Sequence, residues 1–121
     1  MRNALESLDG ESKIDAVFTH APGTKGGDAA ELHALHSVFG RELPDIFSNK
    51  FLIGHTLGAS GSLSLLSAIG LLKGWAPGKF PYDSLLGFNR KSEKYGTIMV
   101  NAAGFGGNAL SVIVGLPQWG S

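Results

Sequence analysis

The chain has 121 residues, of which 43% are apolar and 17% charged, and its ten acidic and ten basic residues cancel. This balance excludes a disordered tail and gives no electrostatic reason to expect nucleic acid or an anionic membrane as a partner. The length suits one domain with a modest core, and the lack of cysteine excludes disulfide bonds, thiolate metal sites and a cysteine nucleophile within this chain.

Neither a signal peptide nor a membrane span is predicted. Residues 1–6 lack the apolar stretch of a signal peptide. The most apolar run, residues 63–72, is interrupted by Ser and Gly and is too short to cross a bilayer. We therefore expect a cytoplasmic protein that binds neither membrane nor nucleic acid.

The first part of the chain predicts a helix, a strand and a second helix. Residues 2–9 are expected to form the end of a short helix, and residues 14–19 an apolar strand. Apolar residues at helical spacing then predict a helix over residues 28–39, with Asp28 capping its start and Gly40 its end. The segment that follows, up to Phe47, contains a proline and is interpreted as a connector.

The second part predicts a helix between strands. A short apolar strand is expected over residues 50–53, followed by a turn of small residues. The helix over residues 59–73 is apolar on almost every side, which is typical of a helix buried between layers. Residues 75–89 contain several chain breakers and are interpreted as irregular. Strands over residues 95–103 and 109–116 are separated by a turn short enough for antiparallel pairing.

The resulting order is β-α-β-α-β-β, which favours an α/β fold with a mixed, mostly parallel sheet and a C-terminal antiparallel hairpin. Three loops follow the carboxyl ends of predicted strands. In α/β sheets, ligands bind in the crevice beyond these strand ends. His20 and His55 occupy equivalent positions in the first two loops, and the third is the glycine-rich turn 104–107. Imidazole and backbone N–H groups are the usual donors to an oxyanion, so these loops suit a site that stabilises negative charge on a carbonyl oxygen.

Each feature also has a simpler interpretation. A single loop histidine is usually solvated or caps a helix, Lys50 could be a surface residue of its strand, and the glycine turn could be only a hairpin. That turn is a poor nucleotide-phosphate loop, because its G-x-G-x-x-G pattern is incomplete and no helix follows it. His33 and His36 lie three residues apart and could hold a metal, but no carboxylate stands at a matching spacing, so a solvated helix face is favoured.

Three segments carry a resemblance to a known family. Residues 20–31 are similar to H-G-T-G-T-x-x-G-D-x-x-E, residues 50–61 to K-S-N-I-G-H-x-x-G-A-x-G, and residues 101–107 to N-S-F-G-F-G-G. These are motifs of the β-ketoacyl-acyl carrier protein synthases, which have the thiolase fold. The segments occur in the family's order and span almost the whole chain, so the chain resembles this family.

The resemblance implies that residues 1–121 form a single thiolase-like half-domain, the C-terminal half of a synthase whose nucleophilic cysteine lies in the N-terminal half. It implies a decarboxylating Claisen condensation in fatty-acid or polyketide biosynthesis. His20 and His55 would promote malonyl decarboxylation and stabilise the enolate, while Lys50 would tune their electrostatics. The other implied residues are Thr24, which would contact the phosphopantetheine arm, Phe105 as a gate and oxyanion donor, Gly104 and Gly106 beside it, and Asp28 and Glu31 as structural supports.

No metal or organic cofactor is implied beyond the phosphopantetheine arm of the carrier protein. The expected partners are acyl carrier protein and the N-terminal half, and the chain alone is expected to be inactive. Exposed apolar surface and a free strand edge predict that it dimerises or self-associates. Two alternatives stay open, a non-catalytic partner subunit of the chain-length-factor type and a thiolase-type acyltransferase, because residues 54–61 also fit thiolases.

The sequence departs from the motifs beside the implied catalytic residues. Ala21-Pro22 replace Gly-Thr, Phe51-Leu52 replace Ser-Asn, and Ala102-Ala103 replace Ser-Phe. One residue is also missing after Gly107. These changes alter the substrate-facing residues and predict a divergent synthase whose acyl substrate is left open.

Overall fold

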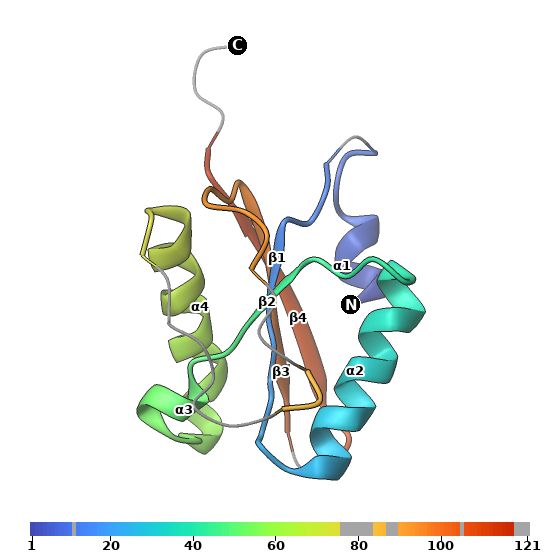
Figure 1. Cartoon of the computed structure of the whole chain (residues 1–121), viewed down its shortest axis with the longest axis vertical. Coiled ribbons are helices and arrows are strands. Elements are labelled where there is room, and N and C mark those ends of the chain that lie inside the picture. Colours follow the sequence, from blue (N-terminus) through green and yellow to red (C-terminus); the bar gives the residue numbers. More distant parts are fainter. Residues whose placement is uncertain (11, 76–83, 87–89, 105, 118–121) are drawn as a thin grey trace.

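A four-stranded sheet with the order β2-β1-β3-β4 forms the centre of the molecule, with helices on both of its faces (Figure 1). The computed structural model describes residues 1–10, 12–75, 84–86, 90–104 and 106–117. The strands are β1 (Ala16–Phe18), β2 (Asp45–Phe47), β3 (Thr97–Ala103) and β4 (Ala109–Gly115). The helices are α1 (Arg2–Glu6), α2 (Lys25–Phe39), α3 (Lys50–Ile53) and α4 (Ser60–Leu72), and a single 3-10 turn, η1 (Leu57–Ala59), precedes α4.

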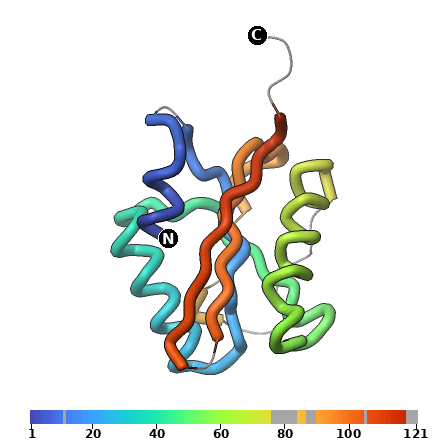
Figure 2. The backbone as a smooth tube through the Cα atoms, turned by 180° about the vertical axis from the view of Figure 1, so that it is seen from behind, coloured from blue at the N-terminus to red at the C-terminus, as the bar shows by residue number. Residues whose placement is uncertain are grey.

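The sheet topology confirms the predicted fold class. β1 pairs in parallel with β2 and with β3, whereas β3 and β4 form an antiparallel hairpin. The helix α2 lies on one face of the sheet and α4 on the other, as the views from front and back both show (Figures 1 and 2). Because the three parallel strands end at the same edge, the loops that follow them gather there.

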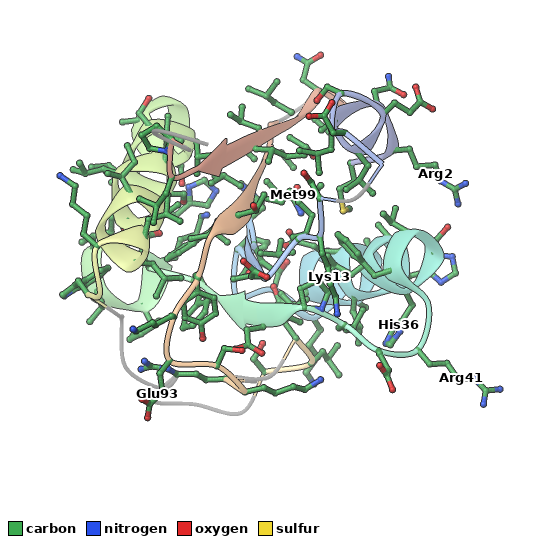
Figure 3. All side chains as sticks on the ribbon, turned by 90° about the horizontal axis from the view of Figure 1, so that it is seen from above. Arg2, Lys13, His36, Arg41, Glu93 and Met99 are labelled. Carbon is green, nitrogen blue, oxygen red and sulfur yellow. The ribbon has the colours of Figure 1, made fainter. Side chains whose placement is uncertain are left out.

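Two apolar clusters fill the space between the sheet and its helices. Alternate residues of each strand face opposite clusters, as the two-residue period of a strand requires. Viewed from above, Met99 lies inside the molecule, while the charged side chains of Arg2, Arg41 and Glu93 lie at its periphery (Figure 3). The buried members on the α4 side are Ala16, Phe18, Phe47, Ala68, Leu71, Tyr95, Ile98 and Val100, and those on the α2 side are Ile14, Val17, Ala21, Leu35, Ile46, Leu86 and Met99.

The position predicted for the second strand is wrong. Lys50–Ile53 is the helix α3, and the strand is Asp45–Phe47, in the segment interpreted as a connector. Both apolar side chains of β2 are buried, whereas Leu52 and Ile53 are 55% and 48% exposed. Burial on both faces therefore selects the earlier segment as the strand. Pro44 precedes it without conflict, because β2 is an edge strand of the described sheet.

The start predicted for the second helix is also wrong. The helix α2 begins at Lys25, and its N-cap is Thr24, whose Oγ1 accepts a hydrogen bond from the Gly27 N–H at 3.2 Å. Asp28 is therefore not the cap. It lies in the first turn, where a negative charge suits the helix dipole, and its Oδ1 accepts the N–H of Gly23 at 3.2 Å.

The remaining elements are confirmed, although α1 ends at Glu6 and not at residue 9, and β1 and β3 begin two residues later than predicted. Gly40 ends α2 with a φ of 79°. At the end of α4 the N–H of Trp75 donates to the Gly70 carbonyl and that of Gly74 to the Leu71 carbonyl, both at 3.0 Å, which is a Schellman motif. Most of residues 75–89 lie outside the described part of the chain. Among the described residues, no helix has the length and apolarity needed to cross a membrane.

Candidate active site

His20 lies just beyond β1, in a loop held by Glu31 from α2. The carboxylate of Glu31 accepts two backbone hydrogen bonds, from the N–H of His20 to Oε1 and from the N–H of Ala21 to Oε2, each at 2.8 Å. Ala21 has a φ of 35°, which is strained for a residue with a Cβ atom. Two charge-assisted hydrogen bonds therefore hold the loop in a conformation that it would not adopt by itself.

The ring of His20 is oriented by the hairpin. The backbone N–H of Ala103, at the end of β3, donates to Nδ1 of His20 at 3.2 Å. The neutral ring therefore carries its proton on Nε2. Burial, followed by the charges of Lys50 and His55, lowers the pKa of His20 to about 4. His20 is thus neutral at neutral pH, and its Nε2–H is available as a donor.

His55 lies beside His20, with the ring centroids 5.2 Å apart and the ring planes at 80°. Its Nδ1 accepts the backbone N–H of Leu57 at 3.1 Å, so its neutral ring also carries the proton on Nε2. Leu57 has a φ of 53°, a strained turn that directs this N–H toward the ring. The prediction that both histidines directly follow strands is wrong for His55, because α3 separates it from β2, but the structure brings the two rings together.

Lys50 is the first residue of α3, not of a strand, and is 7% exposed. Burial lowers the pKa of its ammonium group, and the charges of Glu31 and Asp28 act in the opposite direction. The preceding residue, Asn49, donates from Nδ2 to the Ser67 hydroxyl of α4 at 2.8 Å. This contact ties the start of α3 to α4 and keeps the lysine close enough to the site to influence the pKa of His20.

A cavity of about 630 Å³ brings both histidines together with Thr24 and Gly104. Its lining residues are His20, Pro22, Thr24, Gly27, His55, Leu57, Gly58, Ala103 and Gly104. Phe105 lies outside the described residues, and Gly106 is part of the turn, with a φ of 85°. Asp28 and Glu31 do not line this cavity, and their carboxylates accept backbone N–H groups of the loop that does.

Two polar residues of the hairpin join the site, although sequence reasoning gave them no role. Asn101 Nδ2 lies 3.5 Å from Glu31 Oε1, and the hydroxyl of Ser111 donates to Asn101 Oδ1 at 2.8 Å. Asn101 is 6% exposed. The available signal was a polar residue within the otherwise apolar strand, because a buried amide requires hydrogen-bond partners.

Residues 1–78 match the family described as "Beta-ketoacyl synthase, C-terminal domain". The chain belongs to this family. It is 30% identical over 123 residues to 3-oxoacyl-[acyl-carrier-protein] synthase 1 of Escherichia coli K12, covering 94% of this chain and 30% of that protein. It is also 30% identical over 112 residues to 3-oxoacyl-[acyl-carrier-protein] synthase 2 of Mycobacterium bovis, covering 84% of this chain and 27% of that protein.

Among solved structures, the ishigamide ketosynthase/chain length factor superposes with a TM-score of 0.82 at 26% identity, covering 97% of this chain and 32% of that one. The predicted thiolase-like fold and synthase family are therefore confirmed. The family match favours a synthase over a thiolase. This synthase domain spans about 30% of the length of the curated relatives that it matches.

Two of the six positions at which this synthase domain departs from the family motifs line the cavity. Pro22 and Ala103 both line it and give it apolar wall on two sides. A Cβ atom on Gly27 would lie 2.6 Å from Pro22 Cγ, so this proline fits only because a glycine faces it. Pro22 therefore gives the cavity an apolar wall where the family motif has the hydroxyl of a threonine.

His33 and His36, the two histidines of α2, take no part in this site. His36 Nδ1 lies 2.8 Å from the carbonyl oxygen of Gly40 at the end of the helix. Within the described ranges, no group of three or more His, Cys, Asp or Glu residues is placed to hold a metal ion.

Proposed function

We propose that this chain is the C-terminal half of a 3-oxoacyl-[acyl-carrier-protein] synthase and that His20 and His55 act on the thioester of malonyl-carrier protein. The observation that supports this most directly is the pair of imidazole rings 5.2 Å apart. Backbone N–H groups donate to Nδ1 of both rings, so both imidazoles offer an Nε2–H. Donors that are fixed before the substrate arrives stabilise developing negative charge most effectively.

The proposed chemistry begins with the malonyl thioester. Cleavage of its C–CO₂⁻ bond releases carbon dioxide, and the electron pair left behind is delocalised onto the thioester oxygen as an enolate. The two Nε2–H groups would stabilise the charge on this oxygen. The enolate carbon then attacks an acyl thioester, forming a carbon–carbon bond as the thiolate leaves. Because the chain has no cysteine, that thiolate belongs to the N-terminal half.

The surrounding residues suit this role. The low pKa of His20 keeps its ring a neutral donor over the whole physiological range. The buried charge of Lys50 contributes to that low pKa. Thr24 Oγ1 accepts from Gly27 and keeps its own hydroxyl proton free to donate to an amide of the phosphopantetheine arm. The roles of Phe105 as a gate and of Gly104 and Gly106 as its neighbours remain predictions from the motif.

The proposed partners are acyl carrier protein, which delivers substrate on its phosphopantetheine arm, and the N-terminal half, with dimerisation of the complete enzyme in the cytoplasm. A second candidate is a non-catalytic partner subunit. It is favoured by the likeness to a ketosynthase/chain length factor, and it would use the same fold to shape the acyl tunnel. The retention of both histidines in one cavity supports the catalytic role.

A chimaera tests the proposal. Joining the N-terminal part of the Escherichia coli synthase 1 to this chain should give an enzyme that releases carbon dioxide from malonyl-carrier protein. His20→Ala and His55→Ala should each lower this rate by about 100-fold or more, the usual cost of removing one oxyanion donor. His36→Ala, on the exposed side of α2, is the matched control and should leave the rate unchanged.

The alternatives give different results in the same assay. Gel filtration and circular dichroism establish that each chimaera is folded. Equal decarboxylation by the unsubstituted chimaera and by both histidine variants would remove His20 and His55 from the mechanism. A folded chimaera without decarboxylation would instead support the chain-length-factor role.

A further inference from the structure

Ser111 lies on β4, yet a series of hydrogen bonds connects it to the His20 loop. Its hydroxyl donates to Asn101 Oδ1 at 2.8 Å, and Asn101 Nδ2 approaches Glu31 Oε1 at 3.5 Å. Glu31 accepts the backbone N–H groups of His20 and Ala21 at 2.8 Å. The path therefore runs from β4 through β3 and α2 to the loop after β1.

The hydroxyl of Ser111 determines which way the Asn101 amide faces. An amide presents an acceptor on one side and a donor on the other. In the observed orientation Oδ1 accepts from Ser111 and Nδ2 faces the carboxylate of Glu31. The reversed amide would place its oxygen against another oxygen, which is repulsive. Without the serine hydroxyl, Oδ1 would be buried without this partner, and the amide would turn to recover one.

We propose that Ser111 is a positioning residue, which holds the Asn101 amide toward Glu31 and, through Glu31, fixes the backbone of His20 and Ala21 at the cavity. The proposal rests on the proposed function only in treating His20 as a working group. Ser111 does not line the cavity that contains both histidines. It lines a neighbouring cavity of about 310 Å³ with His20 and Glu31, and the contacts described above connect it to the His20 loop.

The same hydrogen bonds also affect the protonation of Glu31. Burial raises the pKa of Glu31, and its hydrogen bonds with Ala21, His20 and Asn101 oppose that rise. Asp28 on α2, Lys50 on α3 and His55 are the other charged or titratable groups that act on His20. A rotated Asn101 would make Glu31 easier to protonate. A protonated Glu31 would accept weaker hydrogen bonds from the two backbone N–H groups.

Amide hydrogen exchange measured by NMR on the whole chain tests this inference. In Ser111→Ala, the amides of His20 and Ala21 should exchange about tenfold faster, because one hydrogen bond is worth about one factor of ten in a local opening equilibrium. Amides in the β1–β2 pairing should be unchanged. Ser111→Thr should restore the protection, because it keeps the hydroxyl and a strand tolerates its branched side chain.

Ile113 provides the matched control, since it lies on the same face of β4 and packs into the α2-side cluster. Ile113→Val should lower global stability without accelerating the two loop amides selectively. Selective acceleration in this variant, or unchanged loop amides in Ser111→Ala, would overturn the positioning role. None of these readouts uses malonyl chemistry, so their result is separate from the outcome of the decarboxylation assay.

Discussion

The backbone N–H of Ala103 donates to Nδ1 of His20, which joins the end of the antiparallel hairpin to the loop after the central parallel strand. Because the donor belongs to the main chain, every substitution at Ala103 except proline keeps it. The tautomer of His20 is therefore set by the pairing of β3 within the sheet, and the fold itself presents Nε2–H to the cavity.

The first prediction concerns the titration of His20. Its folded-state pKa should be about 4, compared with an ordinary value of 6.5. Between these values the unfolded chain binds more protons than the folded chain, so the free energy of unfolding should decrease as the pH falls from about 6.5 to about 4. NMR titration of the ring Cε1–H gives the pKa directly. Urea midpoints of His20→Ala should lose this part of the pH dependence, whereas titration near 6.5 would contradict the prediction.

The second prediction is that Glu31→Gln destabilises the chain by about 2 kcal/mol, the usual cost of an unsatisfied buried hydrogen-bonding group. Glutamine offers one oxygen and one NH₂ group, so one of the two backbone N–H groups would face another donor. Urea denaturation at neutral pH measures the loss. Glu42→Gln, at an exposed position, is the control. Equal urea midpoints for the two variants would argue that the Glu31 carboxylate does not hold the loop.

The third prediction compares two adjacent glycines at the start of α2. In Gly27→Ala the new Cβ would lie 2.6 Å from Pro22 Cγ and 2.7 Å from Thr24 Oγ1, so we expect a loss of about 1–3 kcal/mol from overpacking. Gly26 has open space around the same position. Gly26→Ala should therefore stabilise the chain by up to about 1 kcal/mol, the ordinary helix preference. Thermal unfolding distinguishes them, and stabilisation by both variants would show that Pro22 does not constrain this turn.

These glycines also show why the helix start was predicted incorrectly from the sequence. Two glycines in succession resemble a loop, and Asp28 is an excellent cap by residue type. Position 27 requires glycine because Pro22 leaves no room for a larger residue within the helix, and that contact depends on the path of the whole loop. By contrast, α4 and the final hairpin were predictable, because a long apolar run and two apolar strands joined by a short turn are local signals.

The proximity of His20 and His55 was predictable from the motifs, but the hydrogen bonds that connect the surrounding residues were not. The sequence predicted that His20 and His55 occupy equivalent positions directly after their strands, but α3 lies between β2 and His55. Their proximity depends on how α3 and η1 return the chain to the sheet edge. Likewise, the partners of Asn101 are a helix carboxylate and a serine on the neighbouring strand, and neither pairing leaves a signal in the local sequence.

The last prediction concerns association of the chain with itself. β4 is an edge strand of the described sheet, and its neighbourhood exposes Leu110 by 64% and Leu116 by 53%. Exposed apolar strands at an edge invite pairing with another chain. We expect light scattering to show a mass that rises with concentration.

Leu110→Lys should shift association to higher concentration, because a charged residue at an edge opposes strand pairing. Leu85→Lys, at a residue that is 56% exposed but lies outside the sheet, is the control and should have little effect. A constant monomer mass over the whole concentration range would show that this edge does not pair.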